Sequence, residues 1–281
     1  MHNHYLPQYY LKGFCSNSKA NIWVYDKREK RVFSTSVKSI AKICGFYTQE
    51  TEKYLSEEIE APANHVLEKI RNRKPLEGSD KVTLSKYISI MWKRVPEGKA
   101  RLKERAPGIA ADLQERLHGL LDEIAAKERL REGLAQSRKL EVDNILRSIS
   151  REPPAEIWHQ IIRAESTPRV IEAIATMTWR FFTFDEKPAF LTCDNPVFFF
   201  SHMGIGRPES ELSFPVCSNV MLWATRRTDL PEVYSPANMP IVKEMTRRTA
   251  SITTRYVFHA KEEDWVLPLL AKKRWQLNRI Q

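Results

Sequence analysis

Segments that favour β-strands lie only towards the two ends of this chain, and this separation constrains the fold more than any other feature. Near the start, Asn21–Asp26 and 31–34 are rich in β-formers and flank a charged turn, which predicts a hairpin. The next strands are predicted at 189–193 and 197–200. The residues between are patterned mainly as helices. We therefore expect an α+β fold, in which strands from both ends form one mixed sheet with helices packed on it.

Residues 97–150 differ from the rest in composition. They contain no aromatic residue and are dense in Ala, Leu, Glu, Arg and Lys. One apolar stripe is predicted in the first half and another in the second: Leu113, Leu117, Leu120, Leu121 and Ile124, then Leu140, Ile145, Leu146 and Ile149. We expect a helical insertion or arm within a single domain spanning 1–281. It would either dock a protein or a second copy, or pack as two helices onto the core.

Several shorter elements are also predicted. A helix should begin near Pro7, because a missing N–H costs nothing in a first turn. Pro62 should bend or interrupt the helix that follows Thr51. We further expect helices over 36–43, 83–95, 157–164, 167–182, 236–249 and 264–278.

The charge of the chain is unevenly distributed. Residues 1–96 carry 17 Lys and Arg against 10 Asp and Glu, and residues 226–281 carry 11 against 6, whereas 151–225 are mildly acidic. Basic ends attract polyanions such as RNA, DNA or nucleotides, and they also simply aid solubility. We find no apolar run of membrane-spanning length and no secretory signal, so we expect a cytoplasmic protein that contacts no membrane, with reduced cysteines.

Four segments resemble a bacterial family catalogued as domain of unknown function 4238. The opening run from His4 to Phe14 (HYLPQYYLKGF) carries the most specific similarity. The others are 22–27 with the following Phe46 and Tyr47, 192–197 (TCDNPV, where the family tends to carry Ser at Cys193), and 214–216. The region after Ser235 shows little similarity. The resemblance implies a fold shared with that family and supplies no activity.

Two residues within these segments could carry chemistry. The imidazole of His4 could act as a general base or metal ligand, or simply cap and pack against the first helix. Asp194 follows an apolar strand at a turn, where a carboxylate could reach a ligand or metal ion, or could equally bond the local backbone before Pro196. A divalent metal would fit such a pair, although no metal-binding motif identifies one.

Candidate binding residues accompany this pair. Tyr10 and Asn195 lie in the same segments, and Arg247, Arg248 and Arg255 belong to a C-terminal part in which arginines and aromatic residues alternate, as suits phosphates and stacked bases. Because Arg247 and Arg248 are adjacent on a predicted helix, they should point about 100° apart and need not serve one site.

Two functional hypotheses follow. The first is a nuclease-like or other hydrolase acting on nucleic acid or another phosphate-containing substrate, with His4 and Asp194 in one cleft and a role in bacterial stress or phage defence. The second is a non-catalytic module that binds nucleic acid or protein, in which both residues are structural. The chain has no HExxH, P-loop, GxGxxG or GxSxG motif, which argues against the enzyme classes that depend on them.

Overall fold

The computed structural model is an α+β protein, as expected, and describes residues 2–16, 20–128, 132–163, 168–187 and 189–280. The chain divides into two compact units. One comprises residues 1–95 and 163–281, and the other comprises 96–162. The second unit contains the predicted helical segment 97–150 and most of the helix that follows it. The described strands all lie in the first unit.

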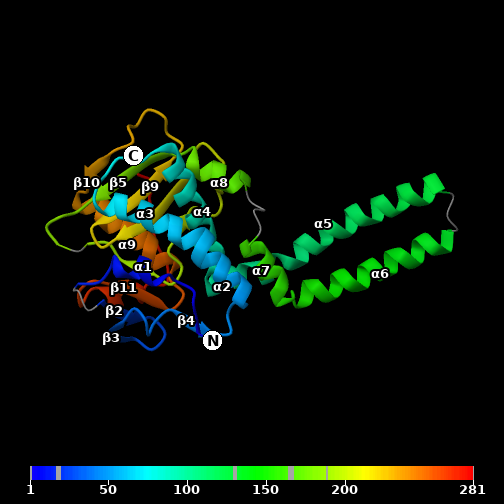
Figure 1. Ribbon diagram of the computed structural model, residues 1–281, viewed down its shortest axis with the longest axis horizontal. Helices are drawn as coiled ribbons and strands as arrows, with labels where there is room; N and C mark the ends of the chain where they lie inside the picture. Colours follow the sequence, from blue (N-terminus) through cyan, green and yellow to red (C-terminus); the bar gives the residue numbers. More distant parts are fainter. Residues whose placement is uncertain (1, 17–19, 129–131, 164–167, 188, 281) are drawn as a thin grey trace. The chain divides into compact units, whose positions relative to one another are not determined.

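The N-terminal hairpin and C-terminal-half strands share a sheet, as predicted. Strand β2 (Asn21–Asp26) pairs antiparallel with β3 (Arg31–Ser36) on one side and with β11 (Tyr256–His259) on the other. Strand β6 (Thr192–Cys193) then joins β11 and completes four strands in the order β3-β2-β11-β6. Figure 1 labels β3, β2 and β11 of this sheet. The sheet thus brings the beginning, middle and end of the sequence together.

The other C-terminal-half strands form a second sheet, where the sequence led us to expect only one. Its order is β10-β5-β9-β8-β7, and β10 runs parallel to β5 while the other pairs are antiparallel. The strands are β5 (Thr178–Thr183), β7 (Phe198–Phe199), β8 (Glu211–Cys217), β9 (Val220–Thr225) and β10 (Tyr234–Pro236). A third, two-stranded sheet joins β1 (His2–His4) to β4 (Lys42–Cys44).

The helices of the first unit follow the predicted periodicity for the most part. The helix begun at Pro7 is α1 (Gln8–Lys12). The helix predicted after Thr51 is present as α2 (Gln49–Tyr54), a π-helical turn η1 (Leu55–Glu60) and α3 (Ala61–Arg71). Pro62 lies in the first turn of α3, directly after the π-helical turn, so the helix continues through it with a local distortion. Helix α4 (Gly78–Arg94) follows, and α9 (Met239–Ile252) lies near the C-terminal end.

Some elements differ from the predictions. Residues 36–43 form no helix, because Lys42–Cys44 pairs with His2–His4 as a strand instead. The helix predicted over 167–182 is replaced by α8 (Pro168–Ala175) followed by β5, while residues 164–167 lie outside the described part. The predicted terminal helix is only α10 (Val266–Leu270). In each case a partner strand or a packing surface distant in sequence outweighs local helical spacing.

Among the described residues, two apolar clusters include side chains of α9. One surrounds Met245, with Phe182 and Trp223 stacked at 5.7 Å between ring centroids. The other joins Tyr25 and Leu191 to residues of α10. Helix α9 is therefore held in both cores, so the directions of its polar side chains are well defined.

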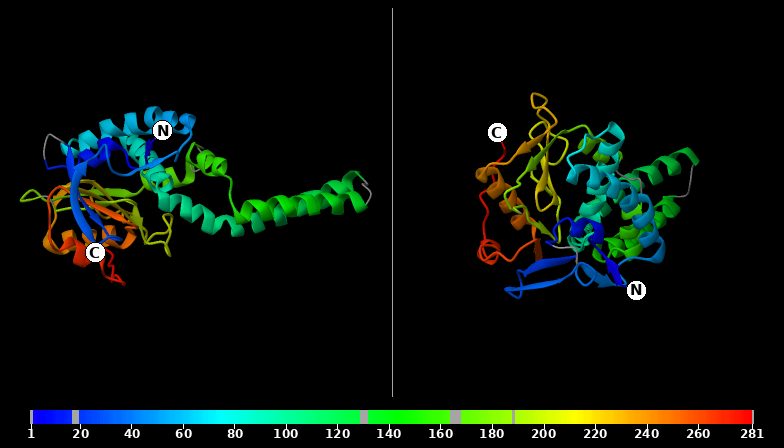
Figure 2. Two further views of the ribbon diagram at one scale, coloured as in Figure 1. Left: turned by 90° about the horizontal axis from the view of Figure 1, so that it is seen from below. Right: turned by 60° about the vertical axis from the view of Figure 1, so that its left-hand side comes forward.

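The second unit is built from helices within its described residues. Helices α5 (Pro96–Glu128) and α6 (Glu132–Arg151) pack side by side, and α7 (Ala155–Arg163) begins within the unit (Figures 1 and 2). Asp143 lies within hydrogen-bond distance of both Gln114 and His118, each at 2.8 Å, while Lys139 reaches Asp122. This order of contacts shows that α5 and α6 run antiparallel.

Candidate functional site

The opening motif meets the 192–197 segment in the interior of the first unit. The hydroxyl of Tyr10 lies 2.6 Å from the hydroxyl of Thr192, and its ring stacks on Phe214 at 5.3 Å. Tyr10 is fully buried, and this burial raises the pKa of its phenol. The structure thus places this predicted binding residue within the core, where its contacts join α1 to both main sheets.

Asp194 is saturated with hydrogen bonds from one short segment. Its carboxylate accepts from the backbone N–H and hydroxyl of Thr254, at 3.0 and 2.6 Å, and from the backbone N–H groups of Arg255 and Tyr256, at 2.7 and 3.1 Å. The residue is only 4% exposed. The carboxylate therefore orders the turn that leads into β11, as a buried acceptor with several backbone donors does.

Asn195 and Arg255 belong to the same connection. The side-chain amide of Asn195 donates to the carbonyl of Ile252 at 3.2 Å, at the end of α9. Arg255 forms an ion pair with the buried carboxylate of Asp26 at 3.0 Å and lies over the Tyr256 ring at 4.7 Å. The Arg255 side chain is still 37% exposed, so it keeps one face towards solvent.

His4 has a different set of neighbours. Its imidazole lies near Lys38, Lys42 and Glu60, and partial burial lowers the pKa of His4 below its usual value. Within the described residues, its Nε2 atom has no hydrogen-bond partner and no contact joins it to Asp194. Asp194 instead lies near Tyr5, the residue after His4. Burial, together with the negative charge of Asp194, raises the pKa of the Tyr5 phenol. Neighbouring residues of an extended segment point to opposite sides, which accounts for the difference.

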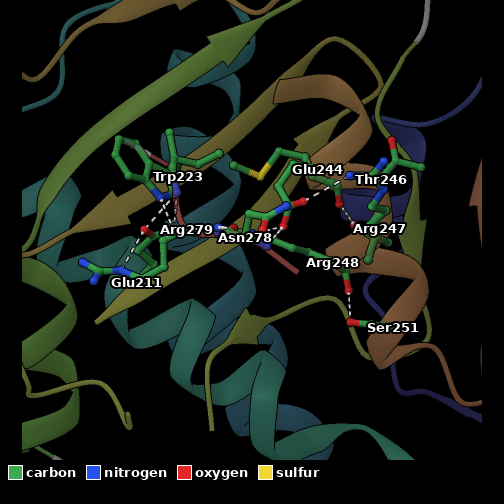
Figure 3. A network of polar contacts seen from close by, with 12 residues as sticks. Glu211, Trp223, Glu244, Thr246, Arg247, Arg248, Ser251, Asn278 and Arg279 are labelled. Atoms are coloured by element: carbon green, nitrogen blue, oxygen red, sulfur yellow. Dashed lines mark hydrogen bonds and ion pairs between the residues drawn. The ribbon is translucent and has the colours of Figure 1, made fainter. Parts of the chain in front are cut away.

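Arg248 lies at the centre of a buried ion network (Figure 3). Its guanidinium contacts Glu211 at 2.6 Å and Glu244 at 3.3 Å, and donates to the carbonyl of Asn278 at 2.6 Å. Arg248 is completely buried and Glu211 is 1% exposed. The segment around Asn278 closes the network, because its own backbone N–H donates to Glu244 at 2.9 Å. The contacts of Arg248 thus link α9 to β8 and to the C-terminal segment.

Arg247 lies at the edge of that network and shares Glu244 with Arg248. Its side chain is 40% exposed, and it forms a 3.6 Å ion pair with Glu244. It lines a groove of about 630 Å³ between α9 and the segment 263–272. This volume lies within the range of ligand-binding sites, which is about 300–1,000 Å³.

The groove has an apolar floor and a basic rim. The floor consists of Phe184, Ala189, Val242, Pro268 and Leu269, with Met239 beside it. Four cations surround it: Lys187, Lys243, Arg247 and Lys272. The acidic residue of the lining, Glu263, accepts a hydrogen bond from the Trp265 indole at 2.9 Å, which fixes the orientation of that ring.

Sequence reasoning identified Arg247 and the basic run that begins at Lys272, but missed Trp265, Lys187 and Lys243. These residues come from separate elements, and only the packing of α9 against the following segment brings them together. The one signal in the sequence was the position of Trp265 shortly before the basic run.

Neither a cluster of metal-binding side chains nor a membrane-spanning helix is found among the described residues. No group of three or more His, Cys, Asp or Glu side chains in the described ranges could hold a metal ion. None of the helices described is both long and apolar enough to cross a bilayer.

Among known protein families, the one described as "Protein of unknown function (DUF4238)" matches residues 2–263. The match thus continues beyond Ser235, where the sequence alone had shown little similarity, and it covers α9 and part of the groove. No curated protein and no solved structure matches the chain.

Proposed function

The chain belongs to the DUF4238 family, and we propose that it binds nucleic acid, with one nucleotide unit held in the groove between α9 and the segment 263–272. The observation that carries this proposal is the combination of four cations and an oriented tryptophan around one apolar floor. Cations attract the phosphate backbone, and an aromatic ring accepts a base by stacking.

The Trp265 ring is well suited to stacking. It is 42% exposed, although large aromatic side chains are usually much more buried. Its hydrogen bond to Glu263 holds the ring in place, which lowers the entropy lost when a base stacks on it. Base stacking on such a ring contributes about 1–3 kcal/mol per base.

The charge of the groove also favours a phosphate-bearing ligand. With Glu263 counted against the four cations, the lining carries a net charge of about +3 if all five are ionised. Lys273 and Arg274 continue the basic run as exposed residues immediately after Lys272. A strand of nucleic acid extending from the groove could therefore meet further cations.

Binding of a fluorescently labelled single-stranded oligonucleotide, measured by anisotropy at several salt concentrations, tests this proposal. We expect binding that weakens steeply with salt, and a loss of about 5- to 150-fold for Trp265→Ala, which corresponds to the stacking energy above. Arg28→Gln is a control, because Arg28 is an exposed arginine outside the groove lining. Binding that is insensitive to salt and to Trp265→Ala would refute the proposal.

A hydrolytic activity remains a second proposal, with His4 and Asp194 as its catalytic pair. It is favoured by the unpartnered Nε2 atom of His4. The four hydrogen bonds at Asp194 argue for a structural role. Incubating oligonucleotides with the wild-type chain and with His4→Ala, with and without Mg²⁺ or Mn²⁺, tests it. Cleavage that disappears in His4→Ala would support this activity.

A further inference from the structure

The helical hairpin of α5 and α6 buries very little of its own apolar surface. Among its described large aliphatic side chains, Leu146 is buried at 7% exposure, while most of the others are partly or largely exposed. Ala106 and Ala110 are the other buried hydrophobic residues there. Two helices alone leave an apolar stripe uncovered, because stable helical folds need a further layer against each stripe.

One uncovered stripe runs along α5. Ile109, Leu113, Leu120 and Ile124 are between 43% and 53% exposed. At 100° per residue, these four positions fall within an arc of about 60° on the helix. They are rotated by roughly 130° on average from Gln114 and His118, which face α6.

Two residues of α6 continue this stripe. Leu134 and Ile145 are 47% and 60% exposed and lie within about 20° of each other on their helix. On α6, the direction of Leu134 and Ile145 is rotated about the helix axis away from the side that faces α5. This rotation has about the same size and the same sense as the rotation of the α5 stripe away from the side that faces α6. Rotations of the same sense on two facing antiparallel helices point to the same side of the pair.

Leu140 is an exception that provides a control. It is 56% exposed and lies on the same helix, but is rotated by about 120–140° from Leu134 and Ile145. It therefore belongs to the opposite side of the hairpin. The six other exposed aliphatic residues lie on one side of the hairpin, where the exposed Arg138–Glu141 ion pair separates Leu134 from Ile145. We call this side the hairpin face: Ile109, Leu113, Leu120, Ile124, Leu134 and Ile145.

We propose that the hairpin face binds the hairpin face of a second copy of this chain, forming an antiparallel four-helix bundle. A two-fold axis parallel to the helices places α5 of one copy against α6 of the other. All neighbouring helices are then antiparallel, the arrangement of up-and-down bundles. This inference is independent of nucleic-acid binding.

The nearly neutral charge of the hairpin favours a second copy of the chain as the partner that binds the hairpin face. The chain carries a net charge of +10, but residues 97–150 carry 11 Lys and Arg against 10 Asp and Glu. Two copies repel each other least through this segment. Arg116 and the ion-paired residues Arg138 and Glu141 are exposed on this side of the hairpin, so both signs of charge accompany the apolar side chains, as a self-complementary interface requires.

The area of the hairpin face also fits a dimer. Six half-exposed aliphatic side chains present on the order of 500 Å² of apolar surface, near the upper limit for a monomer. A standard interface buries about 800 Å² per partner, of which about 65% is apolar in homodimers, or about 520 Å². The face thus supplies the apolar part of one such interface.

Sedimentation velocity of the full chain over a wide concentration range tests the inference. We expect a dimer in the wild type, and at least about a tenfold increase in the dimer dissociation constant for Leu120→Glu and for Ile145→Glu, because each would bury an unpaired charge. Leu140→Glu should leave the dimer unchanged. Far-UV circular dichroism checks that each variant keeps its helices.

Either of two outcomes would overturn this inference. One is a wild-type chain that stays monomeric at every concentration, which would leave the face to a different protein. The other is dissociation by Leu140→Glu to the same extent as by Ile145→Glu. Oligonucleotide binding by the same variants separates this result from the proposed function, since the groove lies in the other unit.

Discussion

The carboxylate of Asp194 lies 2.6 Å from the hydroxyl of Thr254, although sixty residues separate them in the sequence. Together with three backbone N–H donors from 254–256, this contact fastens the end of β6 to the turn before β11. The Asp-Asn-Pro element of the family-like segment thus has a structural role.

We predict that Asp194→Asn lowers the free energy of unfolding by about 1–3 kcal/mol, because an amide replaces one acceptor oxygen with a donor facing N–H groups. Urea denaturation measures this loss. Asp229→Asn is a suitable control, since the Asp229 side chain is 65% exposed and pairs with the neighbouring Arg227. Unchanged stability of Asp194→Asn would contradict the structural role.

The adjacent residues Arg247 and Arg248 should differ sharply in their contribution to stability. Arg248→Ala would leave Glu211 and Glu244 without their buried partner, at a cost of about 3–5 kcal/mol. Arg247→Ala removes one partly exposed contact and should cost less than about 1 kcal/mol. Thermal unfolding of the two variants gives the comparison, and equal losses would show that the ion network does not govern the stability of α9.

The same two arginines give a prediction for binding. Arg247 borders the groove, so Arg247→Gln should weaken oligonucleotide binding and reduce the slope of log K against log salt by about one. The matched Arg28→Gln variant should keep both the affinity and the slope within experimental error. An unchanged salt slope in Arg247→Gln would show that this residue contacts no phosphate.

Stability should depend on pH through His4. Because its pKa in the folded protein is lowered, the folded state binds fewer protons than the unfolded state, and stability increases with pH across this interval. The contribution is fully present above about pH 6.5, the usual histidine pKa, and is lost as the pH falls through the lower folded value. His4→Gln should therefore flatten the stability profile just below pH 6.5. His2→Gln, at an exposed position, should not.

Local periodicity in the sequence determined much of the architecture. The hairpin of β2 and β3, the helices α4 and α9, the helical segment 97–150 and the α+β class all follow from spacing that a few neighbouring residues define. The divergence of Arg247 and Arg248 was equally predictable, since it depends only on the 100° step of a helix.

Packing between distant segments decided the rest. Thr178–Thr183 has a helical pattern of apolar residues but becomes a strand because β9 and β10 pair with it. The sequence suggested that Asp194 could bind a ligand, but in the structure Thr254–Tyr256 supply four hydrogen-bond donors to its carboxylate. The groove likewise needs Lys187, α9 and Trp265 side by side. Such contacts depend on free energies summed over the whole core, which no short stretch of sequence encodes.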